Sequence, residues 1–172
     1  MVTKILKQVG IFSILLTLTA CPVKEDCNDL GRTIEMSNLM HITPLQQVYN
    51  QGDIITVSLE IPRVFQGVDL LAETGDRDVL LTLSDDDLFI NNTIDFIVGS
   101  RNSDHSNWFY LSYIESSELY KLEFQVTLSR QGEYDMFTSE DSINFVGSNC
   151  NRYFIDTSID GAINNRIQFT VN

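Results

Sequence analysis

Residues 120–128 read YKLEFQVTL, and apolar and polar residues alternate there at every position. Successive side chains of a β-strand point to opposite faces of a sheet, so this alternation places the apolar residues on one face. A helix would instead repeat its apolar positions every three or four residues. The stretch therefore predicts a strand that buries one face and exposes the other.

The same period of two recurs in shorter segments from residue 53 onward. They are residues 54–61, 79–83, 88–90, 94–98, 108–114, 134–137, 143–146, 153–159 and 167–171. Asn91 and Asn92 separate two of them and predict a hairpin turn there. A helical period persists nowhere for the roughly 10–12 residues that a helix needs, and only a short helical turn is expected, at residues 116–119.

Eight to ten short strands with polar turns predict an all-β fold with two packed sheets. The segment Gly132-Glu133-Tyr134 resembles the start of a late strand in immunoglobulin-like domains, in which the Tyr hydroxyl ties a corner between the sheets. The spacing from Tyr134 to Cys150 differs from that of antibody domains, so the resemblance implies the architecture alone. We expect one immunoglobulin-like β-sandwich, with a small β-barrel as the alternative that period-two patterning does not separate.

The N-terminus has the pattern of an export signal. Lys4 and Lys7 precede an apolar run over residues 9–19, which is too short to span a bilayer as a helix. The run ends in Leu18-Thr19-Ala20-Cys21, which resembles the lipobox of bacterial lipoproteins. The resemblance implies cleavage before Cys21 and acylation of that cysteine. We therefore expect a signal peptide at 1–20, a lipidated tether at 21–30 and the β-sandwich at 31–172.

The residues that follow the lipobox bear on location. Lys24-Glu25-Asp26 resembles the signal that sends some Bacteroidota lipoproteins to the outer face of the outer membrane. A polar tether is the alternative explanation of the same residues. The expected location is the outer membrane through the lipid, with the cell surface favoured over the periplasmic face.

The chain has three cysteines, at positions 21, 27 and 150. If lipid occupies Cys21, Cys27 and Cys150 remain as a pair in an oxidising compartment, which favours a disulfide between them. Two free thiols or a metal pair are the alternatives, and no His or Cys lies near either cysteine in the sequence to support a metal.

Charge excludes some partners. The net charge is −13, and removal of residues 1–20, which hold two lysines and no acid, makes it −15. So acidic a domain is not expected to bind nucleic acid or an anionic membrane surface through its body. No cofactor-binding motif is present, and we expect no cofactor.

The aromatic run Trp108-Phe109-Tyr110 is the candidate ligand-binding feature. Alternation places Trp108 and Tyr110 on one face of a strand and Phe109 on the other. Exposed rings on such a face could stack on sugars, whereas rings in such runs more often fill a core.

Three further motifs have ordinary explanations. Residues 103–106 (SDHS) hold the residue types of a catalytic triad, but triad partners meet across a fold, and a polar loop explains them. Residues 156–167 partly match a calcium loop but have Ile167 at position 12, so turns at Asp160-Gly161 or Asn164-Asn165 are favoured. The acids at 85–87, near Glu73, Asp76 and Asp78, are expected to be a solvated turn. We expect no catalytic and no metal site.

Residues 141–143 (DSI) resemble the O-glycosylation acceptor of Bacteroidota exported proteins, which would make Ser142 a modification site. The expected function is non-catalytic: a binding module of the cell envelope with an envelope protein as partner. A glycan-binding accessory lipoprotein that uses Trp108 and Tyr110 is one alternative, and a hydrolase with paired carboxylates is the other.

Overall fold

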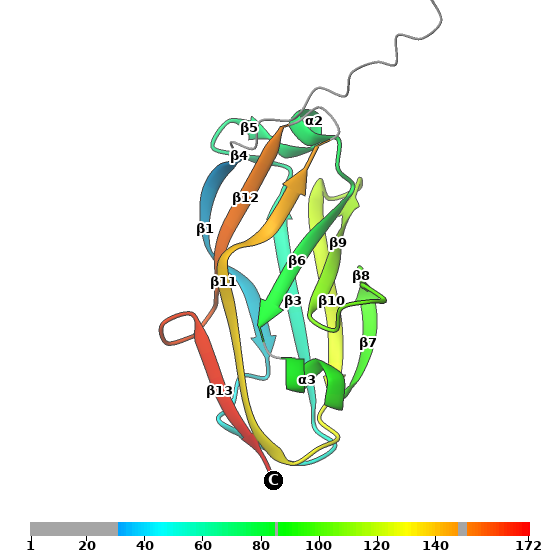
Figure 1. Ribbon diagram of the computed structural model, residues 1–172, viewed down its shortest axis with the longest axis vertical. Coiled ribbons are helices and arrows are strands. Elements are labelled where there is room, and N and C mark those ends of the chain that lie inside the picture. Colours follow the sequence, from blue (N-terminus) through cyan, green and yellow to red (C-terminus); the bar gives the residue numbers. More distant parts are fainter. Residues whose placement is uncertain (1–30, 85, 148–150) are drawn as a thin grey trace, which may run out of the picture.

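The computed structural model describes residues 31–84, 86–147 and 151–172. Most of these residues lie in strands, and two short helices, α2 (Leu70–Thr74) and α3 (Asp86–Asn91), lie at opposite ends (Figure 1). The strands are β1 (Arg32–Thr43), β2 (Val48–Tyr49), β3 (Ile54–Pro62), β4 (Val64–Phe65), β5 (Val68–Asp69), β6 (Asp78–Ser84), β7 (Thr93–Val98), β8 (Ser100–Arg101), β9 (Trp108–Ile114), β10 (Leu119–Thr127), β11 (Gly132–Val146), β12 (Arg152–Ile159) and β13 (Arg166–Val171). No helix among the described residues is long and apolar enough to cross a membrane.

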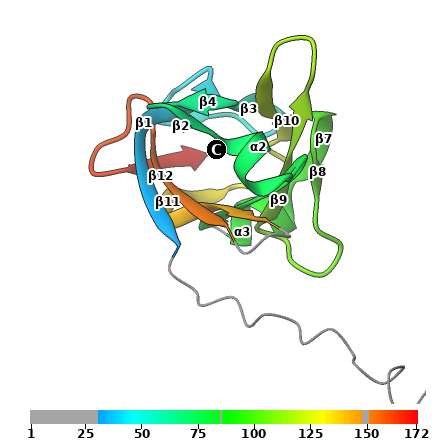
Figure 2. The same cartoon turned by 90° about the horizontal axis from the view of Figure 1, so that it is seen from above.

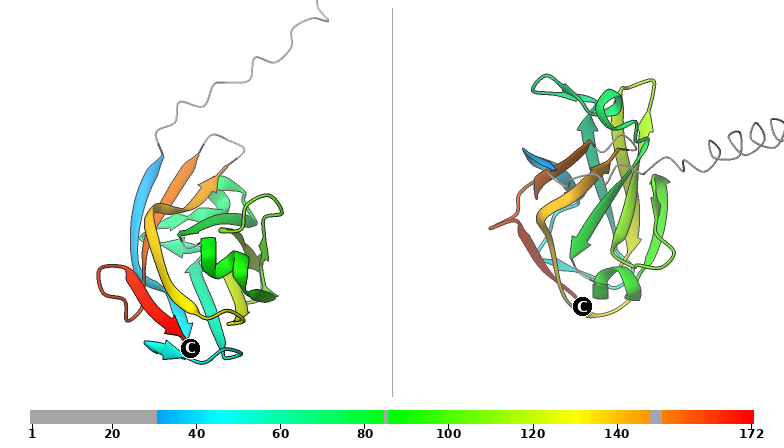
Figure 3. Two further views of the ribbon diagram at one scale, coloured as in Figure 1. Left: turned by 60° about the horizontal axis from the view of Figure 1, so that its bottom comes forward. Right: turned by 45° about the horizontal axis from the view of Figure 1, so that its top comes forward.

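The strands form two packed layers. One, the β3 layer, consists of β1, β3, β10 and β7; the other, the β6 layer, consists of β9, β6, β11 and β12, with β13 beside β11. Figure 1 shows β6, β11 and β12 in front of β3 and β10. The chain enters β1 at the end that carries α2 and leaves β13 at the opposite end (Figures 1 and 3). The predicted all-β sandwich is confirmed.

The layers are hydrogen-bonded to one another at their edges, so the strands enclose the core (Figure 2). The first half of β1 pairs with β12, and after an irregularity between Met36 and Met40 the second half pairs with β3. Asn38, with φ +59°, lies at this change of partner. Sandwich and barrel, the two predicted alternatives, therefore each describe part of the architecture.

At the other edge, the chain changes layer at a glycine. β7 pairs with β10 in one layer, and β8 pairs with β9 in the other. Gly99 connects them with φ +86°, and a Cβ there would collide with the carbonyl oxygen of Tyr110 and the side chain of Leu122. Only glycine fits this crossing.

The predicted strand at 120–128 supplies the centre of the core. The inward side chains of Tyr120, Leu122, Phe124, Val126 and Leu128 are each at most 1% exposed. The Phe124 ring stacks on Phe109 of the opposite layer, with 5.0 Å between centroids and 5° between planes. The alternation read from the sequence is thus the division between core and outer surface.

Tyr134, in the segment that resembles immunoglobulin-like domains, makes the contact that the resemblance implies. Its hydroxyl donates to the carbonyl oxygen of Arg130, four residues upstream, at 3.0 Å. The bond fixes the chain where it turns from β10 into β11.

Three local predictions are wrong. Residues 88–90 belong to α3, because the neighbours Leu88 and Phe89 are both buried whereas adjacent strand residues would face opposite ways. Asn92 donates from Nδ2 to the carbonyl oxygen of Leu88 at 2.9 Å, so it caps a helix instead of turning a hairpin. Residues 116–118 lie in the turn between β9 and β10, and residue 119 begins β10; Glu118 has φ +52°, which a helical turn does not allow.

Candidate binding surface

Trp108 and Tyr110 lie on the outer face of β9, and both are half-buried. Phe109 and Leu111, between and after them, are fully buried in the core. The predicted division of this aromatic run between two faces is confirmed. The two rings do not fill the core. What they can bind therefore depends on the residues around them on the outer face.

Strand register extends this surface across the whole β6 layer. Tyr110 is paired with Leu80 of β6, Leu80 with Asn144 of β11, and Asn144 with Phe154 of β12. Trp108 is paired with Thr82 in the adjacent row. Neighbouring strands lie ~4.8 Å apart, so the row of four residues spans roughly 14 Å. We call this surface the aromatic face; its residues are Leu80, Thr82, Trp108, Tyr110, Asn144 and Phe154.

Neither described helix covers the aromatic face: α2 and α3 lie beyond the two ends of the β6 layer (Figure 1). All six residues are half-buried on a surface of the described structure. Sequence reasoning identified Trp108 and Tyr110 but missed Leu80, Asn144 and Phe154. The available signal was that residues 79–81 and 153–155 are apolar or aromatic at every position, which gives their strands an apolar outer residue as well as a core face.

The rings of the aromatic face are held in place. The His105 ring lies on Trp108, with 3.9 Å between centroids and 30° between planes. The Arg152 guanidinium lies 4.8 Å from the centre of the Phe154 ring, and Gly31 lies so close to that ring that a Cβ would clash. Immobilised rings lose little conformational entropy when they contact a ligand.

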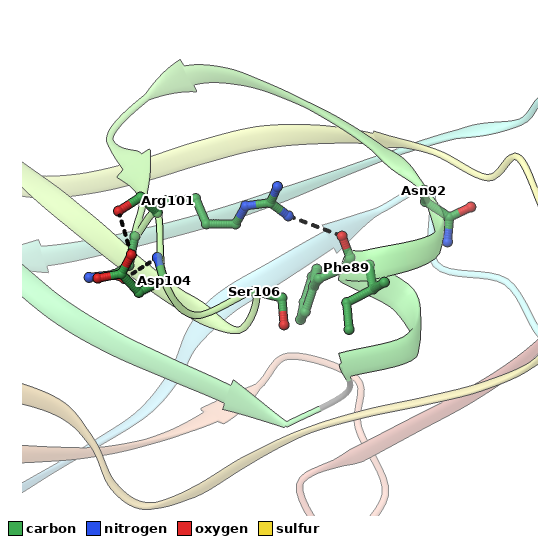
Figure 4. A pocket seen from close by; sticks show the side chains of 8 residues that line it. Phe89, Asn92, Arg101, Asp104 and Ser106 are labelled. Carbon is green, nitrogen blue, oxygen red and sulfur yellow. Dashed lines mark hydrogen bonds between the residues drawn. The ribbon is translucent and has the colours of Figure 1, made fainter.

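A cavity of about 620 Å³ opens beside the start of β9, between α3 and the loop that joins β8 to β9 (Figure 4). We call it the loop pocket. It is lined by Phe89, Ile90, Asn92, Arg101, Asn102, Ser103, Asp104 and Ser106. Arg101 Nη1 donates to the carbonyl oxygen of Phe89 at 3.0 Å and so joins the loop to the helix.

The opposite outer face, on the β3 layer, differs in composition. Its outward residues in β3 and β10 include Thr56, Ser58, Glu60, Glu123 and Gln125. Lys121 Nζ and Glu60 Oε1 form an ion pair across these strands at 2.7 Å. The outward residues of β3 and β10 are mostly polar, as expected of a sheet surface in water. Exceptions on this face are Ile54 and, in β7, Ile97; they are 49% and 55% exposed and carry no aromatic ring.

The calcium-like segment is a pair of turns. Asp156 lies within β12 and accepts the backbone N–H of Asp141, and Asp160 Oδ2 lies 3.4 Å from His41 Nδ1. Gly161, Asn164 and Asn165 have positive φ, as the favoured turn interpretation requires. The described part of the chain has no group of three or more His, Cys, Asp or Glu arranged to hold a metal ion.

The triad residue types at 103–106 serve the loop itself. Ser103 Oγ donates to Asp104 Oδ1 at 3.1 Å, and His105 stacks on Trp108. The acids near residue 85 are also dispersed: Ser112 donates to Asp78 at 3.0 Å, and Asn151 donates to Glu73 at 3.0 Å.

Burial raises the pKa of the Asp76 carboxyl, as the acid of a glycosidase would require. Asp76, however, lines none of the described cavities. Glu133 and Asp135 do line one cavity, of about 650 Å³, but Arg166 forms an ion pair with Asp135 at 3.0 Å.

The glycosylation motif at 141–143 is corrected by burial. Ser142 is 2% exposed, and its hydroxyl has no hydrogen-bond partner among the described residues. A glycan attached to a buried hydroxyl would have to displace the core side of β11. The folded domain therefore does not present Ser142 as an acceptor.

The lipidation at Cys21, the Cys27–Cys150 disulfide and the tether at 21–30 lie outside the described residues. They stay predictions from the sequence.

No protein-family profile matches the chain, and no curated protein matches it. Solved structures that are similar in fold include three at 11–13% identity. The cohesin module from a Clostridium perfringens ATCC13124 family 33 glycoside hydrolase has a TM-score of 0.45 and 11% identity, over 78% of this chain and 98% of that one. The human F-spondin reeler domain has a TM-score of 0.42 and 12% identity, over 86% and 99%. A non-cellulosomal cohesin from Archaeoglobus fulgidus has a TM-score of 0.33 and 13% identity, over 80% and 92%. Similarity at this level carries no argument about ligand or activity.

Proposed function

We propose that the protein is a membrane-anchored, non-catalytic binding module of the cell envelope and that the aromatic face contacts an envelope protein. The observation that carries this proposal is the row Tyr110–Leu80–Asn144–Phe154, which lies in register on a sheet face that neither described helix covers. Protein interfaces are enriched in Tyr, Trp and Phe and depleted of charge at their centres. The aromatic face has this composition, and the face of the β3 layer does not.

The chemistry of the surface favours binding over turnover. Catalytic groups need matched pKa values and a shared cavity. Here His105 stacks on Trp108, and Asp135 is paired with Arg166. The rings of the aromatic face therefore offer contact area for a partner and no catalytic group.

The anchor is part of the same proposal. Lipid on Cys21 would tether the domain, and the ten residues 21–30 reach at most roughly 35 Å when extended. The acidic body would be repelled by a negatively charged membrane surface. Display on the outer face of the outer membrane follows from the Lys24-Glu25-Asp26 resemblance.

Site-specific photo-crosslinking in intact cells tests the binding face. Benzoylphenylalanine replaces Thr82 on the aromatic face or, as the matched control, Gln125 on the β3 layer. Both residues are uncharged, outward-facing and half-buried in mid-strand. We expect a defined crosslinked envelope protein from position 82 and none from position 125. Equal crosslinking from both positions, or crosslinking from 125 alone, would contradict the proposed face.

The anchor needs a separate experiment. Cys21→Ala should abolish incorporation of labelled fatty acid and release the protein into soluble fractions. Cys27→Ala is the matched control and should incorporate label as the unmodified protein does. Equal labelling of the Cys21→Ala protein would refute the lipobox interpretation.

A further inference from the structure

We infer that the loop pocket is a binding site for an uncharged carbohydrate, distinct from the aromatic face. The inference adds a second ligand to the proposed binding function, and the two are tested separately. The pocket volume, about 620 Å³, lies in the range of roughly 300–1,000 Å³ typical of small-ligand sites. Its lining selects among ligand classes through charge, hydrogen-bonding groups and apolar surface.

Charge argues against ionic ligands. The described lining residues include one cation, Arg101, and one carboxylate, Asp104, in a chain of net charge −13. An anion would meet the Asp104 carboxylate and the negative field of the whole domain. A cation would meet the Arg101 guanidinium. A neutral ligand faces neither repulsion.

Hydrogen-bonding capacity argues against an apolar ligand. Six of the eight lining residues are polar, and four of these, Asn92, Asn102, Ser103 and Ser106, are uncharged. An apolar molecule would remove water from the Arg101 guanidinium and the Asp104 carboxylate without replacing its hydrogen bonds, which is costly. A molecule with several hydroxyl groups donates to the carboxylate and accepts from guanidinium and carboxamide groups.

Arg101 supplies donors that the fold does not use. Within the described residues, its guanidinium makes one hydrogen bond, to the carbonyl oxygen of Phe89, and forms no ion pair. That bond fixes the side chain and leaves the other guanidinium N–H groups for a ligand. Figure 4 shows Arg101 between the loop and α3.

The loop is already ordered around the pocket. Asn102 Oδ1 accepts the backbone N–H groups of Asp104 at 2.8 Å and His105 at 3.2 Å. Asn102 Nδ2 donates to the Tyr110 hydroxyl at 3.1 Å, so Tyr110 holds the loop from β9. Such preorganisation lowers the entropy cost of binding a small ligand. Tyr110 is therefore a positioning residue for this pocket.

Apolar groups complete the match to a sugar ring. Phe89 forms part of the lining, and Ile90 is 63% exposed beside it. Sugar rings have C–H faces as well as hydroxyl edges, so they need apolar surface next to hydrogen-bonding groups. The pocket offers both within one loop and one helix end.

Saturation-transfer NMR on the full-length protein in a sugar-free detergent tests the inference. The probes are the neutral disaccharides maltose, cellobiose, mannobiose and chitobiose, with digalacturonate as an acidic probe and glutamine as a zwitterionic one. Arg101→Gln and Asp104→Asn remove lining charges. Arg130→Gln is the matched control, because Arg130 donates to Asn91 of α3 but does not line the pocket.

We expect at least one neutral disaccharide to bind and its affinity to fall at least about tenfold in Arg101→Gln, as expected when a charged hydrogen bond is lost. Arg130→Gln should stay within about twofold, and unchanged thermal midpoints show that the variants fold. Asp104→Asn, which keeps the loop's shape, should also weaken binding. Three results would overturn the inference: no neutral disaccharide bound, equal affinity in the Arg101 and Arg130 variants, or binding of glutamine or digalacturonate in place of the neutral probes. Crosslinking from position 82 does not depend on these results, so failure here leaves the proposed protein contact standing.

Discussion

The two outer faces of the sandwich differ, although the strands beneath them follow one rule. Both layers turn alternate apolar residues into a shared core, as Leu81 of β6 and Val57 of β3 do, each fully buried. Outward, Glu60 and Gln125 on the β3 layer are typical of a solvated sheet, whereas Leu80, Tyr110 and Phe154 on the β6 layer are not. Folding requires the inward set. Apolar residues gathered on an outer face that neither described helix covers therefore point to contact with another molecule.

The largest expected effect comes from comparing substitutions at two neighbouring residues of β9, one in the core and one on the outer face. The quantity compared is the free energy of unfolding. Phe109→Ala empties a ring site that contacts Phe89, Phe96 and Phe124, so it should lower the free energy of unfolding by about 3–5 kcal/mol. Tyr110→Ala should cost clearly less, because that ring is half-buried on the outer face. Chemical denaturation measures both, and similar losses would show that Tyr110 is a core residue.

Substitution of Asp76, next to the start of β6, should change the thermal midpoint at one pH and not at another. Burial raises its pKa above the ordinary value of 3.8, so the folded state disfavours the ionised form. The contribution of protonated Asp76 to the free energy of unfolding is therefore fully present below pH ~4. It is lost as the pH rises through the pKa of Asp76 in the folded state. Asp76→Asn should therefore raise the thermal midpoint at pH 7 and leave it nearly unchanged at pH 3. A lower midpoint at pH 7 would mean that the ionised carboxylate is needed.

The ion pair on the β3 layer should matter little. Lys121→Ala removes the contact with Glu60, and exposed pairs of this kind contribute about 0.2–1 kcal/mol. Addition of salt should reduce the difference between the variant and the unmodified protein. A loss above about 2 kcal/mol would show that this polar face also has a structural role beyond that of ordinary surface pairs.

Ser142→Ala should have the smallest effect. The hydroxyl is buried without a partner in the described structure, so its removal should change the free energy of unfolding by at most about 0.5 kcal/mol or slightly stabilise the protein. Intact mass before and after chemical deglycosylation checks the related correction. A glycan at Ser142 of the folded protein would contradict the burial.

The sequence predicted those strands whose alternation of apolar and polar residues is regular. The strands at 54–61, 108–114 and 120–128 appear within one residue at each end, with the expected faces. β1 was missed because Ser37 and Asn38 interrupt its alternation where it changes partner. α3 was missed because six residues are too few to show a helical period.

The candidate surfaces were only partly predictable for a similar reason. Alternation placed Trp108 and Tyr110 together, because both lie on one strand. Leu80, Asn144 and Phe154 join them through strand order and register, which period-two patterning does not encode. The loop pocket likewise needs α3 and the β8–β9 loop to meet, as they do through the bond from Arg101 to Phe89.

The most direct test of the central claim compares two double variants, one on each outer face. Leu80→Thr with Phe154→Thr removes apolar contact area from the aromatic face without touching the loop pocket, and Thr56→Ala with Gln125→Ala is the control on the β3 layer. The measurement is the yield of the envelope protein crosslinked from position 82 in intact cells, normalised to surface level and to an unchanged fold. The account predicts a loss of at least about tenfold for the first variant and a change within about twofold for the control, since central aromatic contacts carry most binding energy. An unchanged yield in the first variant, or an equal loss in both, would contradict it.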